Sequence, residues 1–185
     1  MKKIIAVMLC AFMLLGCVSA VAEANEKTVL GVVEMKGAFR LECNIPEGYS
    51  LETFIANPDC FLGLLTSDDA DKPRVGISIA FSEIYADVER LNDLDADSLA
   101  GIEESFTAED EVDITYMETA YGTKLMVVRE ISEGMDYIDF YTIYKGYEVE
   151  VVLTYGAEFA EKSITEEQVQ MVVDFLSDMD FVPVA

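Results

Sequence analysis

Alternation between apolar and polar residues along short segments is the feature that most constrains how this chain can fold. The clearest case is the segment 75–81, in which Val75, Ile77 and Ile79 are separated by glycine and serine. Successive side chains of a strand point to opposite faces, so this period of two predicts a strand with one buried face. Further strands are predicted at 29–34, 38–45, 60–65, 112–119, 124–131, 137–144 and 147–155. Together they predict an antiparallel sheet of roughly six to eight strands.

The last two of these segments are joined by Lys145-Gly146, which suits the two-residue turn of a β-hairpin. Such a turn fixes which residues lie opposite each other. The expected pairs on the core face are Tyr144 with Tyr147, Phe140 with Val151, and Ile138 with Leu153. The other face is expected to carry a mixed set, comprising Tyr137, Tyr141, Ile143, Glu148, Glu150 and Val152.

Two segments follow the period of a helix instead. In 97–107 the residues Leu99, Ile102 and Phe106 form one apolar stripe. The tetrapeptide Thr165-Glu166-Glu167-Gln168 has the sequence of a capping box, so a second helix is expected to begin there. An edge strand containing Pro183 is expected to close the chain, because proline is tolerated at the edge of a sheet. The predicted class is α+β, with the sheet flanked by two or more helices.

Proline, glycine and aspartate predict the loops. The segment 46–59 contains Pro46, Gly48 and Pro58 and is expected to be a loop or an irregular turn. The cluster Asp68-Asp69-Ala70-Asp71 is expected to form a hairpin loop between two strands.

The N-terminus has the pattern of a bacterial export signal. Lys2 and Lys3 precede an apolar run at 4–15 that is too short to cross a bilayer, which takes roughly 20 residues. An Ala-Glu-Ala site would remove a leader of residues 1–24, whereas a lipobox-like Leu-Leu-Gly-Cys would remove residues 1–16 and lipidate Cys17. The chain is therefore expected to be exported, and either secreted or lipid-anchored to the outer face of the membrane. Residues 25–37 are expected to form a lead-in and the first strand, followed by a single domain at 38–185.

Charge and histidine content exclude several classes of partner and site. The chain has 36 acidic and 12 basic residues, a net charge of −24 and no histidine. Nucleic acids and anionic membrane surfaces are bound through Lys and Arg, so neither is an expected partner, and membrane contact is expected only through a lipid at Cys17. The absence of histidine removes Ser-His and Cys-His nucleophile pairs and the usual zinc ligands.

Cys43 and Cys60 are the two cysteines that follow the leader. An even pair in an exported chain indicates a disulfide. The alternative is a pair of buried free thiols that pack as small apolar groups.

Short motifs resemble those of the PsbP-like domains, a group of extrinsic photosystem, nuclear and exported bacterial proteins. They are the turn Ile45-Pro46-Glu47-Gly48-Tyr49 and a final helix ending in Phe175-Leu176-Ser177-Asp178-Met179-Asp180-Phe181, together with the long hairpins between them. The resemblance covers most of residues 38–182. It implies an α/β/α sandwich around an antiparallel sheet and brings no catalytic residues, because the group shares no active site.

The most suggestive local pattern for a ligand is Asp93-x-Asp95-x-Asp97 with Glu104 after it, which resembles a calcium-binding loop. The pattern departs from that loop at Ser98, where a sharp turn needs glycine. The alternative is an acidic lead-in that caps the helix after it. No cofactor other than calcium is expected.

The expected function is binding of a protein or a ligand, without enzymatic activity, in the envelope or the medium. The candidate binding residues are Tyr137, Tyr141 and Glu150 on the mixed face of the last hairpin, because tyrosine is enriched at binding surfaces. Tyrosine is equally an ordinary strand residue that fills half-buried faces. Two alternatives stay open: an extracellular calcium-binding module and a carboxylate-based hydrolase of carbohydrates.

Overall fold

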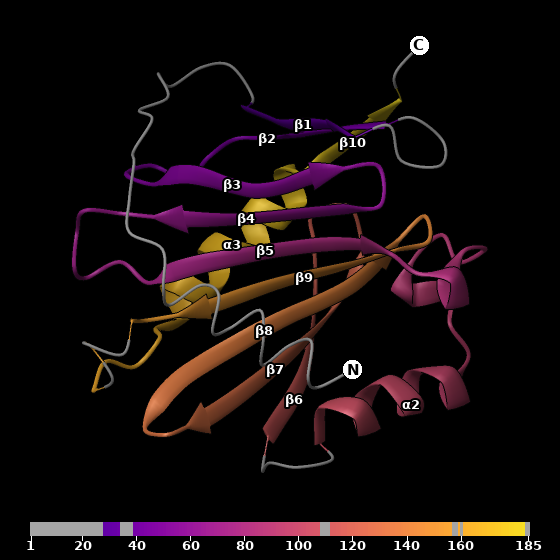
Figure 1. Cartoon of the computed structure of the whole chain (residues 1–185). Helices are drawn as coiled ribbons and strands as arrows, with labels where there is room; N and C mark the ends of the chain where they lie inside the picture. The colour runs from indigo at the N-terminus through magenta and orange to yellow at the C-terminus, as the bar shows by residue number, and fades with distance from the viewer. Residues whose placement is uncertain (1–27, 34–38, 108–111, 157–158, 160, 184–185) are drawn as a thin grey trace.

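The computed structural model describes residues 28–33, 39–107, 112–156, 159 and 161–183 (Figure 1). Within them lie ten strands, two α-helices and two short 3-10 helices. The two candidate cleavage sites and Cys17 lie outside the described residues. No helix in the described part of the chain is long and apolar enough to span a membrane.

Seven strands form one antiparallel sheet, in the order β3-β4-β5-β9-β8-β7-β6. Each strand pairs with a neighbour in the sequence, so most of the sheet is built from hairpins, and the pairing of β5 with β9 joins its two halves. The strands are β3 (Ser50–Asn57), β4 (Cys60–Thr66), β5 (Arg74–Phe81), β6 (Val112–Glu118), β7 (Lys124–Ser132), β8 (Met135–Tyr144) and β9 (Tyr147–Thr154).

The register predicted for the last hairpin is confirmed. Tyr144 pairs with Tyr147, and the other two predicted pairs follow in step. Lys145 and Gly146 form the turn with positive φ values of 49° and 80°, the left-handed geometry that a two-residue hairpin turn requires. The mixed face is also as expected, because Tyr141 lies opposite Glu150.

The loop predicted at 46–59 is wrong, because most of it is the strand β3. Pro46 and Pro58 lie outside the strand at either side, so neither interrupts its hydrogen bonds to β4. A turn at Pro46 and Gly48, closed by the Tyr49 N–H donating to the Pro46 carbonyl at 3.0 Å, leads into the strand. By contrast, the acidic loop at 67–73 does connect two paired strands, as expected.

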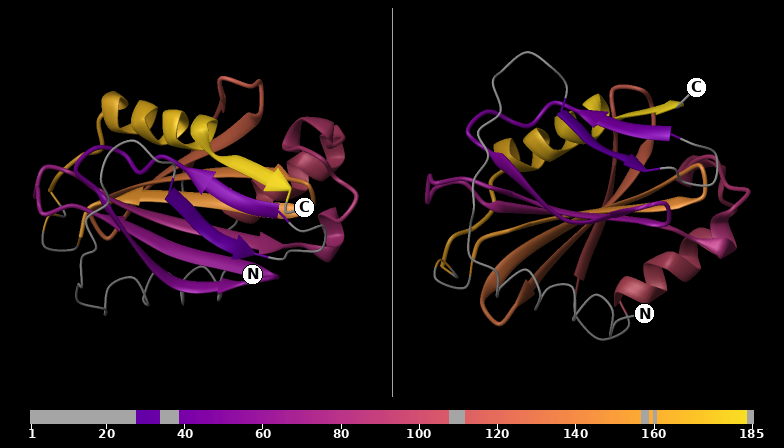
Figure 2. Two further views of the ribbon diagram at one scale, coloured as in Figure 1. Left: turned by 90° about the horizontal axis from the view of Figure 1, so that it is seen from above. Right: turned by 45° about the horizontal axis from the view of Figure 1, so that its top comes forward.

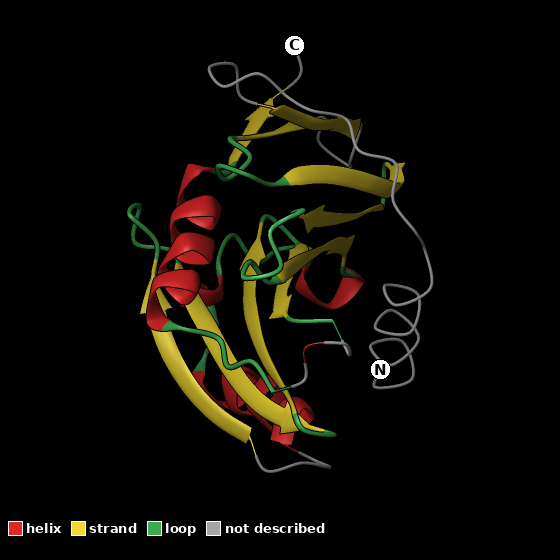
Figure 3. Cartoon of the chain, turned by 90° about the vertical axis from the view of Figure 1, so that its left-hand side faces the viewer, coloured by secondary structure: helices red, strands yellow, loops and turns green. Residues whose placement is uncertain are grey.

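The helix α3 (Glu166–Asp178) covers one face of the sheet, as Figures 2 and 3 show. The predicted capping box is formed: Thr165 accepts a hydrogen bond from the Gln168 N–H, and the Gln168 side chain accepts from the Thr165 N–H. Val172, Val173 and Phe175 of this helix are buried against alternate residues of the strands. This larger core lies between α3 and the sheet.

The helix α2 (Ala96–Thr107) packs on the opposite face, next to β6. Ile102 is its buried residue, in contact with a smaller core that includes Met126 of β7 and Tyr141 of β8. Two 3-10 helices, η1 (Glu83–Tyr85) and η2 (Leu91–Asp93), lie between β5 and α2. The predicted α+β class is therefore confirmed, with helices on both faces of the sheet.

Three strands form a second, smaller antiparallel sheet in the order β1-β2-β10, drawn at the top of Figure 1. They are β1 (Thr28–Val33), β2 (Phe39–Cys43) and β10 (Asp180–Pro183). Pro183 is on the edge strand β10, as the sequence predicted. Leu41 of β2 is fully buried in the larger core, so the two sheets share one interior.

Candidate functional site

A cavity of about 440 Å³ lies where the β8–β9 turn, the β6–β7 turn and the C-terminal end of α3 meet. We call it the end pocket. It lies on the α3 side of the sheet, because it is lined by Thr142 and Val149, which alternate with the residues of the mixed face. Its walls come from four segments that are far apart in the sequence, at 89–90, 119–125, 142–149 and 176–179.

One wall is the segment 88–90, which is hydrogen-bonded to the β8–β9 turn. The Lys145 N–H donates to the Glu89 carbonyl and the Gly146 N–H donates to the Val88 carbonyl, both at 2.9 Å. Arg90 also forms an isolated β-bridge with Tyr144. These bonds bring the backbones of Arg90 and Lys145 together at the mouth of the pocket.

The opposite wall is the β6–β7 turn, which is closed by the Thr119 N–H donating to the Thr123 carbonyl at 2.9 Å. The side chain of Asn92 donates to the Gly122 carbonyl at 3.1 Å and accepts from the Lys124 N–H at 2.8 Å. The Ala120 N–H donates to the Ser177 hydroxyl of α3 at 3.0 Å. The walls are therefore held together by direct hydrogen bonds and do not depend on a ligand to form.

The floor of the end pocket combines apolar side chains with threonines, and its rim is charged. Leu125, Val149 and Met179 of the floor are buried, and Thr142 beside them donates to the Lys124 carbonyl at 2.8 Å. On the rim, the side chains of Glu89, Arg90, Tyr121 and Lys145 are exposed. The rim carries two cationic groups and one carboxylate, although acidic residues outnumber basic ones in this chain by 36 to 12.

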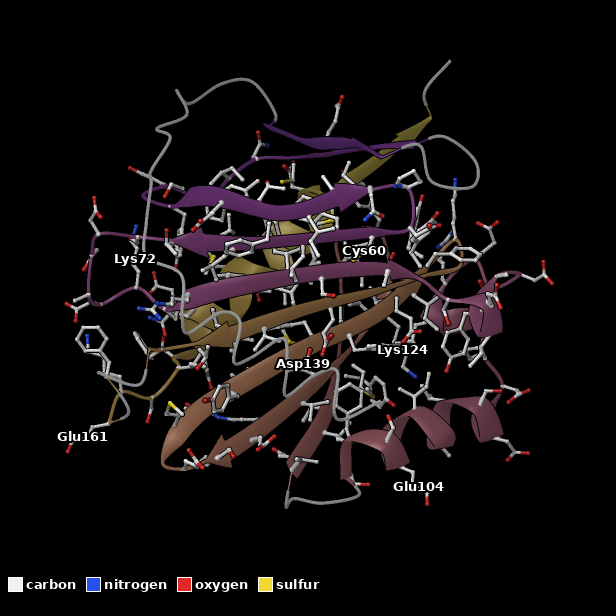
Figure 4. All side chains as sticks on the ribbon, in the orientation of Figure 1. Cys60, Lys72, Glu104, Lys124, Asp139 and Glu161 are labelled. Carbon is white, nitrogen blue, oxygen red and sulfur yellow. The ribbon has the colours of Figure 1, made fainter. Side chains whose placement is uncertain are left out.

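Besides the end pocket, the structure contains a close pair of carboxyl groups on the other face of the sheet. Asp139 of β8 and Glu150 of β9 are diagonal neighbours, because Asp139 pairs with Val152 and Tyr141 pairs with Glu150. Their side chains are hydrogen-bonded to each other. Asp139 Oδ1 and Glu150 Oε1 are buried without another partner among the described residues. Figure 4 shows Asp139 near the middle of the sheet.

Burial sets the protonation of this pair. It raises the pKa of Asp139 well above its usual value, and repulsion from Glu150 raises it further. Burial also raises the pKa of Glu150, although the hydrogen bond from Asp139 opposes that rise. Both groups therefore favour the protonated form more than an exposed carboxyl group does, and Asp139 does so strongly.

The predicted binding residues lie on one face, but the tyrosines among them are buried. Tyr141 is 5% exposed, its hydroxyl donates to Glu148 at 2.9 Å, and its ring packs edge-on against Phe106 of α2. Tyr137 is 9% exposed and its hydroxyl donates to the sulfur of Met135. Tyr141 belongs to the smaller core on the α2 side, Tyr137 is buried on the same face of β8, and Glu150 belongs to the carboxyl pair.

The predicted calcium ligands do not gather around a common point. Asp95 precedes α2 and accepts a hydrogen bond from the Ser98 N–H at 2.7 Å, which lowers its pKa. Asp93 is in η2, whereas Asp97 and Glu104 are two turns apart on α2, where Figure 4 shows Glu104 pointing away from the sheet. Across the described residues, no three acidic or cysteine side chains form a group that could hold a metal ion.

Cys43 and Cys60 are not joined by a disulfide in this structure. Cys43 is buried in the larger core. Phe61 and Leu65 of β4 face into that core. Cys60 is on the opposite face of β4, together with Leu62 and Leu64, because side chains alternate along a strand. The sheet therefore separates the two thiols.

Sequence reasoning missed Asp139 and every residue of the end pocket. Asp139 had a usable signal, because the alternation of β8 places it between Tyr137 and Tyr141, on the same face as Glu150. The pocket residues had none, since no single segment supplies more than a part of the lining. Comparison with models of known protein families finds no match, and no curated protein matches the chain.

Proposed function

We propose that this protein is an exported, non-enzymatic domain that binds a small molecule in the end pocket. The observation that carries the proposal is a cavity of about 440 Å³ whose floor contains buried apolar side chains and whose rim is polar. Small-molecule sites in proteins have this size and combine apolar lining with polar groups that orient the ligand. The export pattern of residues 1–24 supports a role outside the cytoplasm, either free or anchored by a lipid at Cys17.

Binding without catalysis is favoured by the groups that line the pocket. Glu89 is the single carboxylate among them, whereas most glycoside hydrolases use two carboxyl groups on either side of the scissile bond. Asp139 and Glu150 are on the opposite face of the sheet and are hydrogen-bonded to each other. Such a contact leaves no room between the two groups for a glycosidic bond, and we therefore rank hydrolysis below binding.

The placement of α3 and α2 on opposite faces of the sheet agrees with an α/β/α sandwich of the PsbP-like kind. We propose that architecture for the chain. It supports a binding role by analogy alone, because fold does not determine function.

The neutral fluorescent probe N-phenyl-1-naphthylamine tests the proposal, since its emission rises when it enters an apolar site. We expect saturable binding to the wild-type protein. We expect loss of that binding in Leu176→Trp, which replaces an aliphatic side chain in the lining of the pocket by a bulkier indole ring. Ile131→Trp is the matched control, because Ile131 is 74% exposed at the other end of β7 from the pocket. Equal probe binding by Leu176→Trp and the wild type would show that the end pocket is not the binding site.

A further inference from the structure

We infer that the ligand of the end pocket is a small organic monoanion with an apolar, aromatic body. This inference rests on the proposed binding function. Its basis is the combination of cationic side chains on the rim with apolar side chains in the lining below, in a chain whose net charge is −24. Cationic side chains at a cavity attract an anionic group to it, because complementary charge favours the encounter and fixes the orientation of the ligand.

Arg90 and Lys145 supply the anion-binding groups. The hydrogen bonds between the segment 88–90 and the β8–β9 turn bring the backbones of these two residues close together, and both residues line the pocket. A guanidinium binds a carboxylate through two parallel hydrogen bonds, and an ammonium nearby adds a point charge. The Lys145 ammonium is 5.5 Å from the centre of the Tyr144 ring, which also lines the pocket.

The lining below the rim selects the body of the ligand. Leu125, Val149, Leu176 and Met179 offer apolar contact and no charged group. Tyr121 lines the mouth of the pocket with a side chain that is 74% exposed, and an aromatic ring placed there gains by stacking against a second ring. The body that fits this lining is a small aromatic group.

Glu89 limits the charge that the rim accepts. Its carboxylate is on the same rim as Arg90 and Lys145, so the three charged groups together carry one net positive charge. A single negative charge on the ligand balances that rim. A cationic ligand would face two like charges, and a multiply charged anion would face Glu89 without a third cation to offset it.

Three compounds with the same body and different head groups test the ligand class: 3-phenylpropanoate, 3-phenylpropan-1-ol and 3-phenylpropylammonium. Each is titrated against the protein loaded with N-phenyl-1-naphthylamine, and each is also tested for its effect on the melting temperature, which rises when a ligand binds the folded state. We expect the propanoate to displace the probe at the lowest concentration and the ammonium at the highest. Displacement at equal concentrations would overturn the inference about charge and leave the proposed binding function standing. No probe signal and no thermal shift with any compound would overturn both.

Single substitutions on the rim then assign the effect to named residues. Arg90→Gln and Lys145→Gln should each weaken binding of 3-phenylpropanoate by roughly two- to fivefold, the range of a partly exposed ion pair, and should weaken binding of 3-phenylpropan-1-ol less. Glu89→Gln should strengthen binding of the propanoate, because it removes a like charge from the rim. Lys162→Gln is the control for net charge, since Lys162 pairs with Asp71 at the other end of β9 from the pocket. A loss in Lys162→Gln equal to that in Arg90→Gln would show a general charge effect and overturn the assignment to the rim.

Discussion

At the scale of single residues, the carboxyl pair of Asp139 and Glu150 is the feature that most opposes the stability of the fold. Burial of two acidic groups in contact raises the pKa of both, which favours the protonated form of the pair. The pair replaces what would otherwise be an apolar contact between β8 and β9 on the α2 side of the sheet. The amount by which the pair lowers the free energy of unfolding depends on pH, because the folded and unfolded chains bind protons differently.

We expect Asp139→Asn to stabilise the protein at high pH. Both folded-state pKa values are raised, so the pair costs stability progressively as pH rises from about 4, the ordinary carboxyl value, towards the raised values. Asparagine cannot ionise and still donates a hydrogen bond to Glu150. The free energy of unfolding in urea should increase by about 1 kcal/mol or more at pH 8, and by much less at pH 4.

The control for this prediction is Asp174→Asn, the same change at an exposed position on α3. It should leave the dependence of stability on pH as it is in the wild type. Parallel pH profiles for the wild type and Asp139→Asn would show that the pair does not carry a raised pKa.

At the scale of elements, the connections between strands and helices depend on a few side chains. The carboxylate of Asp136 on β8 is 6% exposed and accepts from Arg129 Nε of β7 at 3.0 Å and from the Ile164 N–H at 2.8 Å. Ile164 directly precedes the N-cap of α3. Asp136 therefore fixes the start of α3 to the β7–β8 hairpin.

Asp136→Ala should lower the free energy of unfolding by about 2–3 kcal/mol, because it leaves a buried N–H and a charged partner without their acceptor. Asp71→Ala is the matched control: it also removes an ion pair, with Lys162 at 2.8 Å, but the Asp71 side chain is 90% exposed. Its effect should be small. Urea unfolding of both variants measures the difference, and equal losses would show that Asp136 does not anchor the helix.

At the scale of the whole molecule, the sheet divides the protein into two unlike sides. The α3 side holds the larger core and the end pocket, whereas the α2 side holds the smaller core and the carboxyl pair. Hydrogen bonds hold the walls of the end pocket together: they join the segment 88–90 to the β8–β9 turn, and the β6–β7 turn to Asn92 and to α3. None of these bonds involves the carboxyl pair. Changes to the pair should therefore alter stability without altering ligand binding.

The intact mass of the protein tests its processing. Cells that express the full-length chain should yield either a chain that begins at Asn25 in the medium, or a membrane-bound chain that begins at Cys17 and carries added lipid mass. Reduction should leave the mass unchanged, because Cys43 and Cys60 are free thiols. A chain that keeps Met1 would contradict export, and a gain of two hydrogens on reduction would contradict the free thiols.

The sequence alone determined the features that depend on neighbours along the chain. The register of the β8–β9 hairpin follows from one two-residue turn, and the start of α3 follows from a capping box of four residues. Each is fixed by local hydrogen bonds and by a period that can be read in a single segment. The α+β class follows from the succession of such segments.

Tertiary structure decided everything that depends on which segments meet. The strand β3 exists because β4 supplies its hydrogen-bond partners, although its flanking prolines indicated a loop. Cys43 and Cys60 remain apart because the sheet lies between them, and the end pocket is assembled from four segments that share no local pattern. Local periodicity predicts which face of an element a side chain occupies. The contacts made across that face depend on how distant segments pack together, and the candidate site consists of such contacts.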